Sequence, residues 1–421
     1  MFRSAMFGLL SALALSGPVL AAPRTVAPGA AIPGATVGQL IALARQLSPG
    51  LAAAALDAEA AISRITSAGA LPDPTLRIDA DNLDRRNVSM NGRTTIYRLM
   101  QEFPLWGKLD LKRDIAGFEA TAARYRGRTA ELELVARVKS VFAARYATFE
   151  AMTLTQQSLD TIRTATVNVR DLYSQGNAAQ EDVLRLEIEA EELTIEIERL
   201  RGQTIKTAAQ INALLNRRPD AALARPIALR PLPSEKKMRI DALVDRAVRL
   251  NPSIAEGQAK AGSANVTRQL AERNRYPDVS LGTMATKDRD GYAGFGVMAE
   301  VRIPLQWQAK EAEVSAAAAE QTAAEQRLRS LRANLEGEVA GMVAEYGAAA
   351  KTLGILQEHH VPRSELVVRT LLTALSTGQA DAFKVLDAIR RLRSVQLEIL
   401  KLRVQLQTTL AEIEKAVGED L

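Results

Sequence analysis

The amino-acid sequence repeats itself once, and this internal duplication restricts the chain to folds built from two similar halves. Four short motifs recur in the same order in both halves. The pairs are Gln-Leu-Ser-Pro at 46–49 with Arg-Leu-Asn-Pro at 249–252, Pro74 with Pro277, Phe-Pro-Leu at 103–105 with Ile-Pro-Leu at 303–305, and Gly176 with Gly378. Their offsets are 203, 203, 200 and 202 residues, so the spacing of the motifs is repeated as well as their order.

A proline-rich segment separates the two halves. It contains Pro219, Pro226, Pro231 and Pro233, and prolines this close together exclude a continuous helix. We therefore divide the chain into a first repeat at 23–217, a linker at 218–239 and a second repeat at 240–418.

The first residues have the pattern of a secretory signal peptide. Arg3 is followed by an apolar run at 6–15, and small residues precede Pro23. A membrane anchor needs about 20 apolar residues, roughly twice the length of this run. We interpret 1–22 as a cleaved signal peptide, which makes the protein an exported one.

Each repeat changes from helical to strand periodicity and back. A helix is expected at 37–70 and its copy at 240–274. Alternating apolar and polar residues then predict two strands in each half, around 76–81 and 97–103 and around 279–282 and 295–303. The runs have roughly the 9–11 residues that a tilted strand needs to cross a bilayer. One such hairpin would suit a soluble protein, but two at equivalent positions of an exported chain favour a membrane β-barrel.

Very long helices follow the predicted strands. Residues 108–173 contain no proline and predict one uninterrupted helix. Its apolar seam comprises Val138, Phe142, Phe149, Met152, Leu159, Ile162, Val169 and Leu172. A heptad seam resumes after Gly176 at Val183, Leu186, Ala190, Leu193, Ile197, Leu200, Thr204, Thr207, Ile211 and Leu214, and all ten positions shifted by 202 residues are apolar or Thr. The fold class is therefore mainly α, with duplicated long helical hairpins and four β-strands per chain.

Four strands cannot close a barrel in lipid, because unpaired backbone groups in hydrocarbon cost several kcal/mol each. The missing strands must come from other copies of the chain. Two copies would give the minimum of eight strands, and three would give twelve. The strand count by itself does not choose between them.

Composition and motifs argue against an enzyme, a cofactor site and nucleic-acid binding. The chain has no cysteine, and its formal net charge of +5 becomes +4 without Arg3. The two histidines, His359 and His360, are adjacent and point about 100° apart on a helix, so we expect a solvated helix end and no metal site. Phosphate-binding loops and the common hydrolase motifs are missing from the sequence.

From 37 to 417 the chain resembles the TolC family of outer-membrane efflux proteins. The most specific motifs are Pro-Asp-Pro at 72–74, Phe-Pro-Leu-Trp-Gly-Lys at 103–108, and the two glycine turns followed by Asp-Val-Leu at 182–184 and Val-Leu-Asp at 385–387. The resemblance implies a homotrimer with one shared 12-stranded barrel, continued by a helical tunnel (an α-barrel) from the outer membrane into the periplasm. It further implies a passive exit duct for small solutes, metal cations or drugs, with a periplasmic adaptor (membrane fusion) protein and an inner-membrane pump of RND type as partners. The motif at 103–108 looks most like the heavy-metal, CzcC/CusC-like branch.

The resemblance also assigns site residues. The turns at 174–181 and 377–381 would lie at the periplasmic tip, where the tunnel narrows. The predicted tip and gate residues are Gly176, Asp182, Gly378, Asp381, Lys384 and Asp387. Copies of Asp387 would form an acidic ring that favours cations, although Lys384 stands where relatives often have a second acid. The alternative is that Asp182 and Asp387 are ordinary solvated acids on helix surfaces.

Aromatic residues are concentrated around the two predicted hairpins. Barrels place aromatic girdles at the membrane–water interfaces. The predicted membrane-interface aromatics are Tyr97, Phe103, Trp106, Tyr292, Phe295 and Trp307. Outer-membrane lipid is accordingly an expected partner.

Two other functions are compatible with parts of this pattern. A soluble periplasmic coiled-coil adaptor would also contain long helical hairpins, although adaptors normally have a single hairpin and this chain is duplicated throughout. A type I duct for secreted proteins would share the whole architecture.

Overall fold

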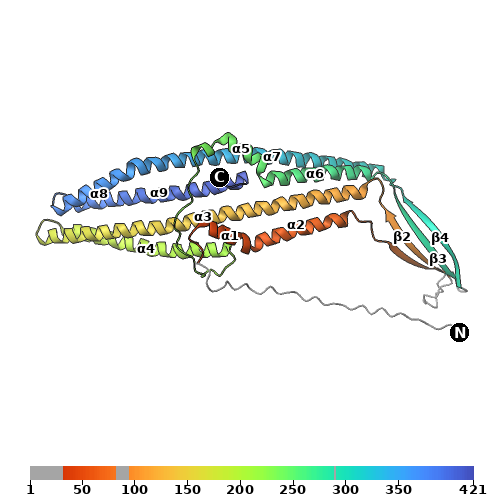
Figure 1. The fold of residues 1–421 in the computed structure, drawn as a ribbon, viewed down its shortest axis with the longest axis horizontal. Helices are drawn as coiled ribbons and strands as arrows, with labels where there is room; N and C mark the ends of the chain where they lie inside the picture. The colour runs from red at the N-terminus through yellow and green to blue at the C-terminus, as the bar shows by residue number, and fades with distance from the viewer. Residues whose placement is uncertain (1–31, 82–93, 289–290) are drawn as a thin grey trace, which may run out of the picture. The chain divides into compact units, whose positions relative to one another are not determined.

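The computed structural model describes residues 32–81, 94–288 and 291–421, and Pro33–Leu421 form one compact unit. The predicted signal peptide at 1–22 lies outside the described residues. The first half contains α1 (Val37–Leu47), α2 (Pro49–Ala68), β1 (Thr75–Asp81), β2 (Thr94–Phe103), α3 (Lys108–Ser174) and α4 (Gln180–Leu214). The second contains a 3-10 turn η1 (Glu235–Lys237), α5 (Ile240–Leu250), α6 (Pro252–Arg273), β3 (Asp278–Asp288), β4 (Gly291–Arg302), α7 (Trp307–Ile355), a π-helical turn η2 (Leu356–His360), α8 (Val361–Ser376) and α9 (Ala382–Val417) (Figure 1).

The helices expected at 37–70 and 240–274 are each divided in two, so this prediction was wrong in detail. Ser48 and Asn251 adopt extended backbone conformations because each precedes a proline that cannot continue a helix. Each then caps the next helix. The Ser48 hydroxyl accepts a hydrogen bond from Leu51 N at 3.4 Å, and the Asn251 side chain accepts one from Ser253 N at 2.7 Å.

The long helix of the second half is also interrupted, whereas α3 runs unbroken for 67 residues. His359 and His360 are exposed, as predicted, but they lie in the π turn η2 instead of at a helix end. The cause is Pro362, which has no N–H to donate and would clash with the preceding turn of a regular α-helix.

The heptad seams pack as the sequence predicts. Every seam position in α3, α4 and α9 is buried or half-buried. One apolar core joins α3, α4, α8 and α9, with Ile162, Leu186 and Val385 almost fully inaccessible. A second core joins α5, α7 and α9, where Leu243 and Leu406 are fully buried. None of the helices in the described ranges has a stretch long and apolar enough to cross a membrane.

The four strands form one antiparallel sheet in the order β1-β2-β3-β4. The central pairing, from Thr94 with Asp288 to Phe103 with Val279, joins the hairpins of the two repeats. Within the chain, β1 and β4 are edge strands, each paired on one side only.

The two faces of this sheet differ in character. Aligned residues on one face are mostly apolar, and Phe295 and Val297 are 84% and 89% exposed there. That face carries Leu76, Ile78, Tyr97, Leu99, Phe103, Leu281, Ala285, Phe295, Val297 and Val301. The opposite face carries charged residues, including the ion pair between Arg302 Nη1 and Glu102 Oε1 at 3.3 Å. The sheet thus exposes an apolar surface without any covering helix on the apolar residues just named.

Candidate functional site: the helical tip and the sheet–helix junction

Two glycine turns form the tip of the helical hairpins. Gly176 and Gly378 have φ values of +75° and +70°, a conformation that L side chains adopt only with strain. Each turn is closed by backbone hydrogen bonds, from Asn177 N to Leu172 O at 2.8 Å and from Gln379 N to Ala374 O at 2.8 Å. The duplicated glycines are therefore required by the turn geometry.

The predicted tip residues come together in one groove. A cavity of about 670 Å³ lies between the two turns. Its lining includes Gly176, Asp182, Gly378, Asp381 and Lys384. Asp387 is exposed on α9, one turn beyond Lys384, and does not line this groove.

Two of the tip acids are helix caps. The Asp381 carboxylate accepts a hydrogen bond from Phe383 N at 3.0 Å at the start of α9. The Asp182 carboxylate accepts one from Ala179 N at 3.3 Å at the start of α4. Both carboxylates also lie at helix N-termini, where negative charge is favoured.

Basic residues neutralise most of the remaining acids near the tip. Arg391 Nε donates to Asp387 Oδ2 at 2.9 Å. Between the hairpins, Arg390 Nε donates to Glu189 Oε2 at 2.6 Å, and Glu189 is only 2% exposed. The pKa of Arg390 is raised above its usual value, first by this hydrogen bond and then by the charges of Glu189, Glu192 and Asp387, against an opposing effect of burial.

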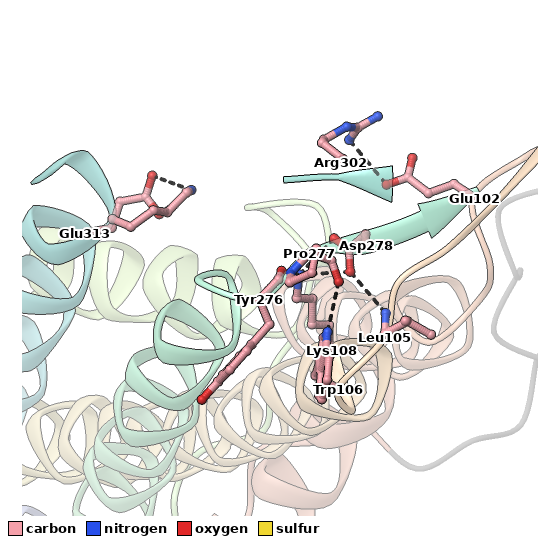
Figure 2. Close-up of polar contacts among 10 residues, drawn as sticks. Glu102, Leu105, Trp106, Lys108, Tyr276, Pro277, Asp278, Arg302 and Glu313 are labelled. Carbon is pink, nitrogen blue, oxygen red and sulfur yellow. Dashed lines mark hydrogen bonds and ion pairs between the residues drawn. The ribbon is translucent and has the colours of Figure 1, made fainter. Parts of the chain in front are cut away.

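The second region is the junction between the sheet and the helices (Figure 2). Trp106 and Gly107 have φ values of +66° and +73°, so the chain turns sharply between β2 and α3. This turn directs Lys108, which is 4% exposed, toward the start of β3. Its ammonium group donates to Asp278 Oδ1 and Oδ2 at 2.9 and 2.8 Å and to Tyr276 O at 2.9 Å.

Two further contacts complete this junction clasp, which we define as residues 105–108 with 276–278. Leu105 N donates to Asp278 Oδ1 at 3.0 Å, and Trp106 Nε1 donates to Pro277 O at 2.9 Å. The rings of Trp106 and Tyr276 lie 5.1 Å apart. The clasp therefore ties the end of the first hairpin to the beginning of the second.

The predicted interface aromatics lie along the sheet and at this junction. Trp106 and Trp307 are half exposed or more, at the starts of α3 and α7. Tyr97 and Phe295 lie on the apolar face, and Phe103 ends β2. Tyr292 belongs to β4, but its side chain lies outside the described residues.

Sequence reasoning missed one buried charge cluster, which joins the two repeats and the linker. Lys139 of α3 donates to Glu414 Oε2 of α9 at 2.7 Å, and Arg230 of the linker donates to both oxygens of Glu414 at 3.0 Å. Lys139 also pairs with Asp420. Burial opposes ionisation of Asp420, but the hydrogen bond from Lys139 and the nearby cations outweigh it and lower the pKa of this carboxyl. The only signal in the sequence was one acid within the apolar seam of α9.

Comparison with protein families supplies the decisive observation. A sequence profile of the family described as outer membrane efflux protein matches residues 40–217 and 243–419. The chain belongs to this family. The resemblance inferred from the sequence is thereby confirmed.

Solved structures of outer-membrane channels have the same fold as this outer membrane efflux protein. OprN matches with a TM-score of 0.77 and 17% identity, over 91% of this chain and 89% of that one. CusC matches with a TM-score of 0.77 and 16% identity, over 91% and 92% of the two chains. VceC from Vibrio cholerae matches with a TM-score of 0.77 and 17% identity, over 91% and 96%. A search of curated protein sequences finds no match.

These findings confirm the fold class of long helical hairpins with four strands per chain. The family consists of outer membrane efflux proteins, which are channels and not enzymes. The roles of individual residues at the tip and the junction remain predictions.

Proposed function

We propose that three copies of this chain form the outer-membrane exit duct of a tripartite efflux pump. The observation that carries the proposal is the four-stranded sheet with one apolar face and two edges, β1 and β4, that have no partner within the chain. A lipid-exposed sheet must close on itself to satisfy its backbone hydrogen bonds. Pairing of β4 with β1 of the next copy would close a 12-stranded barrel, with the apolar face toward outer-membrane lipid.

The helices would continue this barrel as a periplasmic tunnel. In this proposal the repeats at 23–217 and 240–418 each supply one helical hairpin per copy, and the linker at 218–239 wraps the middle. At about 1.5 Å per residue, the 67 residues of α3 reach roughly 100 Å from the junction clasp to the tip. The protein would be located in the outer membrane and would extend into the periplasm.

The tip would be the gate and the docking end. The glycine turns and the groove between them would meet a periplasmic adaptor protein, and an inner-membrane pump of the RND type would supply the energy. The duct itself would be passive and would need no cofactor. Asp182, Asp381, Lys384 and Asp387 would lie at the constriction, and the cargo would be small solutes, either drugs or metal cations as in the CusC-like branch.

The junction would mark the inner surface of the membrane. Trp106 and Trp307 are exposed where the last strand of each hairpin gives way to its long helix. Tryptophan is enriched at membrane–water interfaces, because its ring is apolar and its N–H needs a partner. The junction clasp would hold the barrel in a fixed orientation on the tunnel.

Fractionation and conductance test this proposal. We expect the full chain in the outer-membrane fraction, as a trimer after detergent extraction, and ion conductance after the purified trimer is added to planar bilayers. Recovery of the protein as a soluble periplasmic monomer would contradict the proposal, and so would a detergent-extracted trimer without conductance under any voltage.

A further inference from the structure

The start of α9 differs in charge from the start of α4, although the two segments are equivalent in the duplication. Residues 381–393 contain two acids and four bases. The equivalent residues 179–191 contain five acids and one base. The two repeats therefore present opposite net charges next to their tip turns.

The exposed face of α9 near the tip is itself positively charged. Lys384, Asp387 and Arg391 lie on one face at spacings of three and four residues, and all three are exposed. Arg391 Nε holds Asp387 Oδ2 at 2.9 Å, so this carboxylate is already paired. Lys384 has no ion-pair partner within the part of the chain that the structure describes. Each copy thus contributes two cations and one carboxylate to this face.

The other acids near the turns do not offset this excess. Asp381 is held at the N-terminus of α9 by its hydrogen bond from Phe383 N. Across the groove, Arg185 of α4 pairs with Glu181, and its guanidinium lies 5.9 Å from the centre of the Phe383 ring on α9. The pKa of Arg185 is raised by the hydrogen bond and charge of Glu181 and, more weakly, by the charges of Asp182 and Asp381. Both helix-capping acids of the tip therefore lie in the field of a nearby cation.

We propose that the constriction formed by Lys384, Asp387 and Arg391 of the three copies selects against cations and passes anionic and neutral solutes preferentially. A ring of charged side chains sets the ion preference of a narrow pore, and this ring has a net positive charge in each copy. The inference rests on the proposed function, which puts Asp387 at the constriction. It narrows the cargo from metal cations or drugs to anionic or uncharged organic solutes.

Reversal potentials of the reconstituted full-length trimer test this inference. The measurement uses a KCl gradient at about 0.01–0.1 M, because the Debye length is then roughly 10–30 Å and side-chain charges are incompletely screened. Lys384→Glu reverses one charge, and Arg391→Gln leaves Asp387 unpaired. The control is Lys401→Gln, an exposed lysine on the same helix about 20 Å beyond Asp387.

We expect the wild-type channel to show no cation preference or a preference for chloride. Lys384→Glu and Arg391→Gln should each raise the potassium-to-chloride permeability ratio severalfold, whereas Lys401→Gln should leave it unchanged and Asp387→Asn should lower it. A strongly cation-selective wild type, or a ratio that neither of the first two variants moves, would overturn the inference and leave the duct itself intact. Absence of conductance in the wild type would instead count against the proposed function.

Discussion

At the scale of single residues, buried charges connect segments that are far apart in the sequence. Lys108 bonds to Asp278, 170 residues later, and Lys139 bonds to Glu414, 275 residues later. When one partner of a buried pair is removed, the other charge stays desolvated without compensation. These lysines therefore hold the two repeats together, although neither belongs to the predicted tip or gate.

Replacement of Lys108 by Met should destabilise the protein strongly. The variant leaves Asp278 without its cation, and loss of one partner of a buried pair costs about 3–5 kcal/mol; since Asp278 is partly accessible, we expect the lower end of this range. Thermal unfolding of the detergent-solubilised trimer measures the effect. The matched control is Lys310→Met, which breaks a more accessible pair with Glu313 at 2.8 Å and should cost less than about 1 kcal/mol. Equal losses in the two variants would show that the junction clasp adds nothing to stability.

The sequence predicted some of these residue roles and could not predict others. Asp381 directly precedes a helix, which is the usual signal of a capping residue, and its backbone contact could have been found from the sequence. The bond between Lys108 and Asp278 could not, because it depends on β2 pairing with β3 across the repeats. Hairpin periodicity indicates strands but says nothing about which hairpins are neighbours.

At the scale of helices and turns, glycine substitutions should have opposite effects at different positions. Gly176→Ala and Gly378→Ala place a side chain at positive φ and should each destabilise the tip by about 1–2 kcal/mol. Gly202→Ala lies in the middle of α4 with open space around its Cα and should stabilise the helix by about 0.8–1 kcal/mol. Denaturant unfolding followed by circular dichroism, together with hydrogen exchange at the tip, measures both changes. Loss of stability in Gly202→Ala, or no loss in the two turn variants, would contradict this account.

Element types were predicted well because helical and strand periods persist over long segments. The unbroken α3 and the heptad seams of α4 and α9 follow directly from apolar spacing. The breaks at Ser48 and Asn251 were missed, since a proline is tolerated in the first turn of a helix and the apolar pattern continues beyond it. The π turn before Pro362 is likewise invisible to periodicity, because one extra residue hardly shifts the pattern.

At the scale of the whole molecule, the missing partner of each edge strand requires a second copy of the chain. The sheet order is β1-β2-β3-β4, so the two edges of one copy are separated by three strand spacings, roughly 14 Å. A disulfide requires Cα atoms within about 7 Å. A bond between β1 and β4 can therefore form only between copies.

The absence of cysteine makes this requirement directly testable. We expect variants that combine Leu76→Cys in β1 with Val297→Cys, Ala299→Cys or Val301→Cys in β4 to form disulfides between copies, because these residues share the apolar face of the sheet. A closed ring of three predicts a ladder that ends at the trimer on non-reducing gels. The control pairs Leu99→Cys, in the interior strand β2, with Val301→Cys and should give no bond between copies. A ladder that continues beyond three chains would mean that the sheet does not close, and complete absence of cross-linked species in all three combinations would remove the edge-to-edge contact on which the barrel depends.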